Sequence, residues 1–142
     1  MYTVLAIRKD KVIEFDLLDK IKSRKEILGL ANHPYHLGME YNFNRETRIF
    51  FVIPKIPGVT LTEILAKKGG KLEENNIKFI VAQIVLAIGS LHRKGIVYRN
   101  LTTDSIIIDS VLGTILIGDF KHARTLKNSL EFVVGESLDE GI

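Results

Sequence analysis

The spacing of apolar residues along the chain predicts an alternation of short strands and helices. Residues 2–8 form a β-branched and apolar run typical of a strand, and residues 15–30 carry leucine and isoleucine at helical spacing. Two further short strands are expected at residues 37–43 and 47–53, where a polar turn joins them as a hairpin. Prolines then interrupt the extended chain.

The second half of the chain predicts a short helix, a long helix and a small hairpin. Residues 61–68 form the short helix, for which Thr60 is available as the N-cap. Residues 73–94 carry a stripe of isoleucine, valine and leucine, so we expect a buried amphipathic helix there. Brief apolar runs at residues 106–108 and 114–117 are typical of a hairpin. The whole pattern indicates an α+β fold.

Composition narrows the class of protein. The chain has 142 residues, of which 46% are hydrophobic and 26% charged, and this suits one packed domain at most. Lysines scattered along the chain produce a net charge of +3, which is typical of a solvated surface and argues against a nucleic-acid partner. With no cysteine, disulfides and thiolate metal sites are excluded, and the histidines lack the paired spacing of a zinc site. We find no apolar run of membrane-spanning length and expect a soluble, cytoplasmic protein.

Two motifs in the last third of the chain carry the chemistry. Residues 98–105 read YRNLTTDS where protein kinases have H/Y-R-D-L-x-x-x-N, and residues 119–121 read DFK in place of DFG. Further short words stand at kinase spacing: HPY at residues 33–35, AQIV at 82–85 and GIVYR at 95–99. The chain therefore resembles the protein kinases, and closely the cyclic-nucleotide-dependent kinases of the AGC group.

The resemblance implies a partial kinase fold over almost the whole chain, as one partial domain spanning residues 1–142. Residues 1–53 correspond to the end of the small lobe with the equivalent of helix C, and residues 54–60 to the hinge. Residues 61–142 correspond to the first part of the large lobe through the activation segment. The family's glycine-rich loop and substrate-binding helices are expected to lie outside the chain.

The resemblance also implies that the family's phosphate-binding ion pair is lost. Leu5 falls at the position of the lysine that holds the α- and β-phosphates, whereas a shifted register would place Arg8 there. Arg24 falls at the position of the glutamate that pairs with this lysine. Neither register restores the pair, because Leu5 carries no charge and Arg8 would face a like charge. We prefer Leu5, since it keeps the family's spacing to the next helix.

The catalytic loop and the magnesium loop have also lost groups that the family uses for catalysis. Asn100 stands for the catalytic aspartate, and its neutral amide cannot act as a carboxylate base. Thr102 replaces the lysine that neutralises the transferred phosphate, and Ser105 replaces the asparagine that binds a second magnesium ion. Asp119 is the one magnesium ligand that survives, and the ammonium of Lys121, in place of glycine, is expected to offset its charge.

The activation segment departs from the family as well. Phe132 stands at the activating phosphothreonine, and Glu136 at the threonine that contacts the catalytic aspartate. Arg99 has thereby lost its phosphate partner, and we expect it to brace the loop instead. Asp104 is a weaker option as a replacement carboxylate for metal binding.

The hinge is less damaged, so a vestigial adenine and ribose site is expected there. Ile53 corresponds to the gatekeeper, and the backbones of Pro54 and Ile56 can still present a carbonyl and an amide to adenine. Thr60 replaces the glutamate that binds ribose.

These substitutions favour a catalytically inactive, kinase-like (pseudokinase) module that acts as a structural or interaction subunit and needs no cofactor. Truncation of the fold predicts an open apolar face on the long helix, which a protein partner or assembly covers. The cytoskeleton is one setting for such an assembly in the cytoplasm. Two alternatives stay open: a serine/threonine protein kinase that uses ATP and magnesium with nonstandard residues, and a pseudokinase that senses nucleotide.

Overall fold

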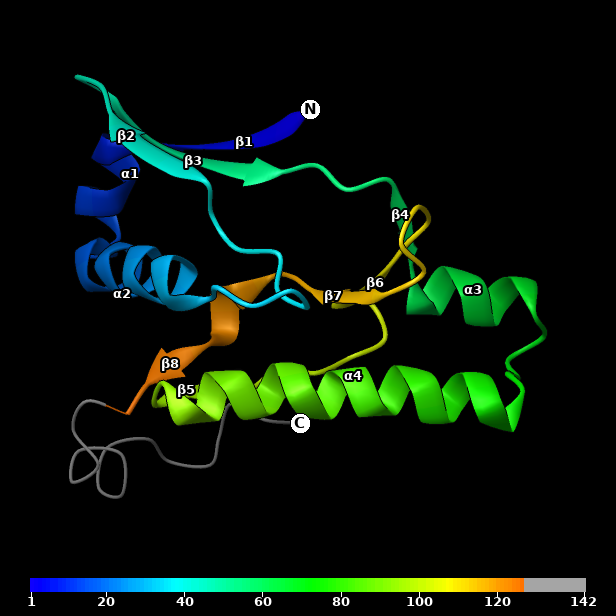
Figure 1. Ribbon diagram of the computed structural model, residues 1–142. Helices are drawn as coiled ribbons and strands as arrows, with labels where there is room; N and C mark the ends of the chain where they lie inside the picture. The colour runs from blue at the N-terminus through cyan, green and yellow to red at the C-terminus, as the bar shows by residue number, and fades with distance from the viewer. Residues whose placement is uncertain (127–142) are drawn as a thin grey trace.

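The computed structural model describes residues 1–126. In chain order the elements are β1 Tyr2–Arg8, α1 Lys9–Glu14, α2 Leu18–Leu30, β2 Tyr41–Asn44, β3 Arg48–Pro54, β4 Gly58–Thr60, α3 Leu61–Lys67, α4 Glu74–Arg93, β5 Ile96–Val97, β6 Ile106–Asp109, β7 Ile115–Ile117, the 3₁₀ turn η1 Phe120–His122 and β8 Arg124–Thr125. Figure 1 shows β1, β2 and β3 beside α1 and α2 in one part of the molecule, and α3, α4, β4, β6 and β7 in the other. The segment between β3 and β4 joins the two parts.

The first sheet has the strand order β1-β3-β2, and both pairings are antiparallel. Leu5 lies opposite Phe51, whose ring is fully buried. Side chains alternate between the two faces of a strand, so Leu5 and Ile7 point inward and pack against the core while Arg8 is exposed. The predicted first strand is confirmed at its bounds, and the predicted hairpin is confirmed with a shorter first strand.

The sequence predicts one helix over residues 15–30, but the structure has two helices in this region. α1 ends at Glu14 and α2 begins at Leu18. Asp16 lies between them with a φ of 49°, a left-handed backbone conformation through which a helix does not continue. The prediction missed α1 because Val12 is its only buried side chain, which leaves no apolar periodicity to detect.

α3 begins at a capping box, as the sequence predicts for Thr60. The Glu63 backbone N–H donates to the Thr60 hydroxyl at 3.2 Å, and the Thr60 N–H donates to the Glu63 carboxylate at 3.1 Å. The preceding strand β4, which the sequence did not predict, pairs with β6. A Cβ atom at Gly58 would lie 2.4 Å from the Ile108 carbonyl oxygen, so β4 approaches β6 this closely only with glycine.

α4 is the longest helix and buries one side only. Gln83, Ala87 and Leu91 are buried, which confirms the predicted helix and one of its stripe residues. The prediction of a wholly buried stripe is wrong, because several of its members are exposed. The exposed large apolar side chains of α4 are Ile77, Phe79, Val81, Val85 and Leu86. These side chains are exposed in the structure, and their coverage by a partner stays a prediction.

By length and composition, α4 also passes as a candidate membrane span among residues 1–126, where the sequence analysis expected none. A core helix of a globular domain meets the same criteria. One side of α4 is attached to the protein, because the Ile115 backbone N–H donates to Gln83 Oε1 at 3.0 Å.

The hairpin of β6 and β7 connects the core to the catalytic positions. Ile106 pairs with Ile117, and both side chains are buried together with Ile115. β7 therefore fixes the start of the segment that leads to Asp119. The short strands β5 and β8, which the sequence treated as loop, pair on the other side of this segment. The described residues form a mixed α+β fold, which confirms the predicted class.

Candidate functional site

Three segments meet at the candidate site: the loop after β5, the turn after β7, and α2. Tyr98 in the loop donates its hydroxyl to the Gly118 carbonyl, and its ring packs edge-on against Phe120 at 5.4 Å between centroids. Phe120 is 2% exposed. Burial raises the pKa of Tyr98, so the phenol stays protonated and keeps donating. These contacts hold the loop and the turn together.

Arg99 braces the loop, as the sequence predicts. Its Nε donates to the His122 carbonyl at 2.8 Å, across the site from the loop to η1. The adjacent Asn100 is half-buried and stands where the family has its catalytic aspartate. An amide at this place offers no carboxylate to accept a proton from a hydroxyl substrate.

Ser105 is used inside the loop. Its hydroxyl donates to the Thr102 carbonyl at 2.8 Å and accepts from the Thr102 backbone N–H at 3.0 Å. The residue is 5% exposed. Thr102 itself is exposed and carries no charge, and Asp104 is also exposed. The serine hydroxyl thus closes the loop on itself.

Asp119 is exposed and forms an ion pair with Lys121, with 3.0 Å between Oδ2 and Nζ. This confirms the prediction that Lys121 offsets the charge of Asp119. Asp119 has a φ of 50°, which its short polar side chain tolerates. Within residues 1–126 there is no cluster of three or more His, Cys, Asp or Glu side chains able to hold a metal ion. Asp119, the surviving ligand position, is engaged by an ammonium, which weakens the donor set that magnesium needs.

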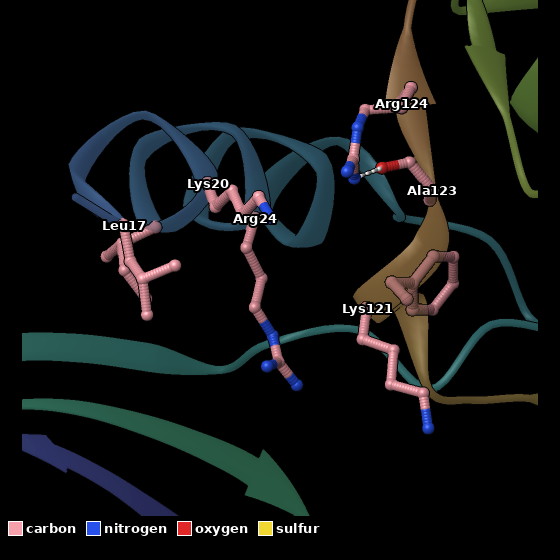
Figure 2. A pocket seen from close by; sticks show the side chains of 8 residues that line it. Leu17, Lys20, Arg24, Lys121, Ala123 and Arg124 are labelled. Carbon is pink, nitrogen blue, oxygen red and sulfur yellow. Dashed lines mark hydrogen bonds between the residues drawn. The ribbon is translucent and has the colours of Figure 1, made fainter. Parts of the chain in front are cut away.

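Neither candidate position on β1 brings a cation to the site. Leu5 faces inward without a charge, and Arg8 points away and hydrogen-bonds Asp10 through its Nε at 3.0 Å. Arg24 on α2 lies on the wall of a cavity, and its Nε is buried without a hydrogen-bond partner. Figure 2 shows its guanidinium projecting away from α2. At this position of α2 the chain therefore has a cation, Arg24, where the family has a glutamate.

The hinge positions lie where β3 ends. Ile53 and Pro54 are half-buried and pair with Thr3 and Tyr2 of β1. The capping box of α3 uses the Thr60 hydroxyl as an acceptor, and a ribose contact by this side chain stays a prediction. Adenine contacts by the Pro54 and Ile56 backbones stay a prediction, as do the roles assigned to residues 132 and 136, which lie outside the described residues.

Sequence reasoning missed a basic cavity between α2 and the turn after β7. Its volume is about 170 Å³, and its wall includes Lys20, Arg24, Lys121 and Arg124. The i, i+4 spacing of Lys20 and Arg24 places both on one helix face and was the available signal. That they face Lys121 and Arg124 depends on tertiary packing, which spacing does not encode.

Known proteins resemble this chain over most of its length. A family model described as protein kinase domain matches residues 2–137. Protein kinase 2 of Dictyostelium discoideum is 31% identical over 129 residues, which cover 91% of this chain and 26% of the relative. A serine/threonine-protein kinase of Arabidopsis thaliana is 30% identical, with 91% of this chain and 27% of the relative covered.

Atypical protein kinase C of Drosophila melanogaster is 33% identical over 110 residues, which cover 77% of this chain and 18% of the relative. The chain thus spans about a quarter or less of the length of these relatives. Relatives of this kind belong to the AGC group, and the narrower likeness to cyclic-nucleotide-dependent kinases stays a prediction. Fold, motifs and relatives agree, and the chain belongs to the protein kinase domain family.

Proposed function

We propose that this chain is a kinase-like module that transfers no phosphate and works through protein contacts. The observation that carries the proposal is the state of the three catalytic positions that the fold preserves. Asn100 supplies no base, Ser105 is closed within its loop, and Asp119 is paired with Lys121. The backbone scaffold of a kinase site is present while its phosphate-handling groups are replaced or engaged.

The size of the rate contributions that are lost supports the absence of phosphotransfer. A positioned general base contributes roughly 10²- to 10⁴-fold to a rate, and one electrostatic stabiliser roughly 10²- to 10³-fold. Phosphoryl transfer relies on positioning and charge neutralisation, so these losses act on the step itself. Loss of the base together with the lysine on β1 removes most of what the fold contributes.

The exposed face of α4 supports an interaction role. Phe79 is 57% exposed, Val85 64% and Leu86 55%. Large side chains exposed together on one element are typical of a protein interface. We propose that an apolar protein surface covers this face, within an assembly in the cytoplasm.

Nucleotide titration tests the loss of phosphotransfer. The melting temperature of the intact protein is measured with ATP, with and without magnesium, and transfer to a basic peptide is assayed alongside. We expect no magnesium-dependent shift and no transfer. A magnesium-dependent shift without transfer would favour a nucleotide-sensing pseudokinase, and transfer abolished by Asp119→Asn would show an active serine/threonine kinase.

Charge substitution on α4 tests the interaction role. Val85→Glu is expected to dissociate the complex isolated with the intact protein, measured as a loss of mass by light scattering. Lys67→Glu, an exposed substitution on α3, is the control. An unchanged complex in Val85→Glu would contradict the proposed surface.

A further inference from the structure

The cavity between α2 and the turn after β7 is unusual in its charge. Its wall includes Lys20 and Arg24 from α2, Lys121 from η1 and Arg124 from β8, and within residues 1–126 no carboxylate lines it. Figure 2 shows Arg24 and Lys121 on opposite sides of the cavity. Leu17, Ile21 and Phe120 supply apolar wall. The cavity thus has several converging donors on an apolar lining, which is the common form of a ligand site.

Few of these charges are compensated by the described residues. Asp119 pairs with Lys121 at 3.0 Å. The other cations on the wall, Lys20, Arg24 and Arg124, form no ion pair within residues 1–126. Arg124 donates to the Ala123 carbonyl at 3.0 Å, which satisfies one N–H and leaves its charge. Like charges around one cavity repel each other, so an anion between them is stabilising.

Arg24 supplies a second, independent observation. Its Nε is buried and has no hydrogen-bond partner. A buried donor without an acceptor costs about 1–3 kcal/mol, and most such groups in folded proteins find a partner. A guanidinium presents a planar fork that fits the paired oxygens of a phosphate. The missing partner of Arg24 therefore has the character of an oxyanion.

We propose that this cavity binds a phosphate-type oxyanion without a metal ion, with Arg24 as its main ligand and Lys121 opposite. Lys20 and Arg124 add positive charge at the rim. The cations take the place that a metal would fill in neutralising the anion. A cavity of about 170 Å³ exceeds the roughly 10–15 Å³ that one water requires. The site stands apart from the proposed interaction role, because it uses a different surface.

Inorganic pyrophosphate is the probe, titrated into the intact protein in the presence of a chelator and followed by calorimetry. We expect binding without magnesium and a higher melting temperature in its presence. Arg24→Gln is expected to weaken binding by roughly 10- to 100-fold, because one charge-assisted donor pair is lost. Lys22→Gln lies on the same helix, pairs with Asp19 and does not line the cavity, so it should bind like the wild type.

Competition experiments show which phosphate compounds the cavity binds, and a second variant provides an independent test. Inorganic phosphate and ATP, both without metal, should compete with pyrophosphate, whereas adenosine should not. Lys121→Gln is a second variant, measured in case Arg24→Gln does not fold, and it should also bind more weakly. The proposal is overturned if pyrophosphate does not bind, if it binds only with magnesium, or if both cavity variants bind it as the wild type does.

Discussion

Gln83 joins α4 to β7 through a side-chain hydrogen bond. Replacing it by leucine shows how much this bond contributes to the free energy of unfolding. The side chain is 3% exposed, and its Oε1 accepts the Ile115 backbone N–H at 3.0 Å while Nε2 donates to the Phe79 carbonyl at 3.2 Å. Leucine has a similar size but no acceptor. In Gln83→Leu the Ile115 N–H is left buried and unsatisfied, at a cost of about 1–3 kcal/mol.

The cost falls on Ile115 because the residue is fully buried and water cannot replace the lost acceptor. The Phe79 carbonyl lies within a helix and loses a supplementary donor only. For a chain of this size, 1 kcal/mol corresponds to roughly 3–4 °C in melting temperature, so a decrease of about 3–12 °C is expected. β7 leads directly to Asp119, so this bond also positions the magnesium-loop remnant.

Urea denaturation followed by circular dichroism measures the free energy of unfolding. Asn75→Leu, at an exposed position on the same helix, is the control and should change it by less than about 0.5 kcal/mol. Amide hydrogen exchange provides a local check, since the Ile115 N–H should exchange faster in Gln83→Leu alone. A variant as stable as the control, with slow exchange at Ile115, would refute the reasoning.

Three other substitutions or conditions test separate parts of the structure. Burial lowers the pKa of His36 below its usual 6.5, and its Nε2 bonds the Ala87 carbonyl at 2.9 Å. Below pH 6.5 the unfolded chain therefore binds a proton that the folded chain does not, and the free energy of unfolding should fall until the folded pKa is reached. Gly58→Ala should destabilise the protein by about 1–3 kcal/mol, because a Cβ there would lie 2.4 Å from the Ile108 carbonyl oxygen. Thr60→Ala removes the hydroxyl cap of α3 and should cost about 1 kcal/mol. Denaturation curves at several pH values, and of each variant at pH 7, measure these effects.

Each of these has its own control. His36→Gln should flatten the slope below pH 6.5, and a wild-type slope that persists would assign it to other groups. Gly29, in the last turn of α2, has no atom near its Cβ position, so Gly29→Ala should be neutral or stabilising where Gly58→Ala is not. For the cap, Thr60→Ser should keep stability near that of the wild type, and an equal loss in both variants would show that the hydroxyl does not matter.

Most of the element pattern could be predicted from apolar spacing and caps. The strand at Tyr2–Arg8 and the start of α3 follow from local sequence, because alternation and a capping box are local signals. Other elements escaped for a physical reason: α1 buries only Val12, β4 depends on its pairing with β6, and β5 and β8 depend on each other. Elements whose stability comes from a distant partner leave little trace in their own residues.

The candidate site also has features that the sequence predicted and features that it missed. The resemblance identified Asn100 and Ser105 as altered positions and Asp119 as the surviving metal ligand, and the proposed offset of Asp119 by Lys121 is confirmed. The choice between Leu5 and Arg8 needed the strand's facing, which places Arg8 outside. The basic cavity around Arg24 was missed, since it joins residues about a hundred positions apart, and only packing brings them together.

The most direct test of the account is the transfer of the γ-phosphate of labelled ATP by the intact protein. Incorporation into the protein itself and into a basic peptide is measured with magnesium, next to the Asp119→Asn variant. We predict incorporation at the level of a blank in both proteins, because no base and no free metal ligand remains at the described catalytic positions. Incorporation by the wild type that disappears in Asp119→Asn would contradict the central claim.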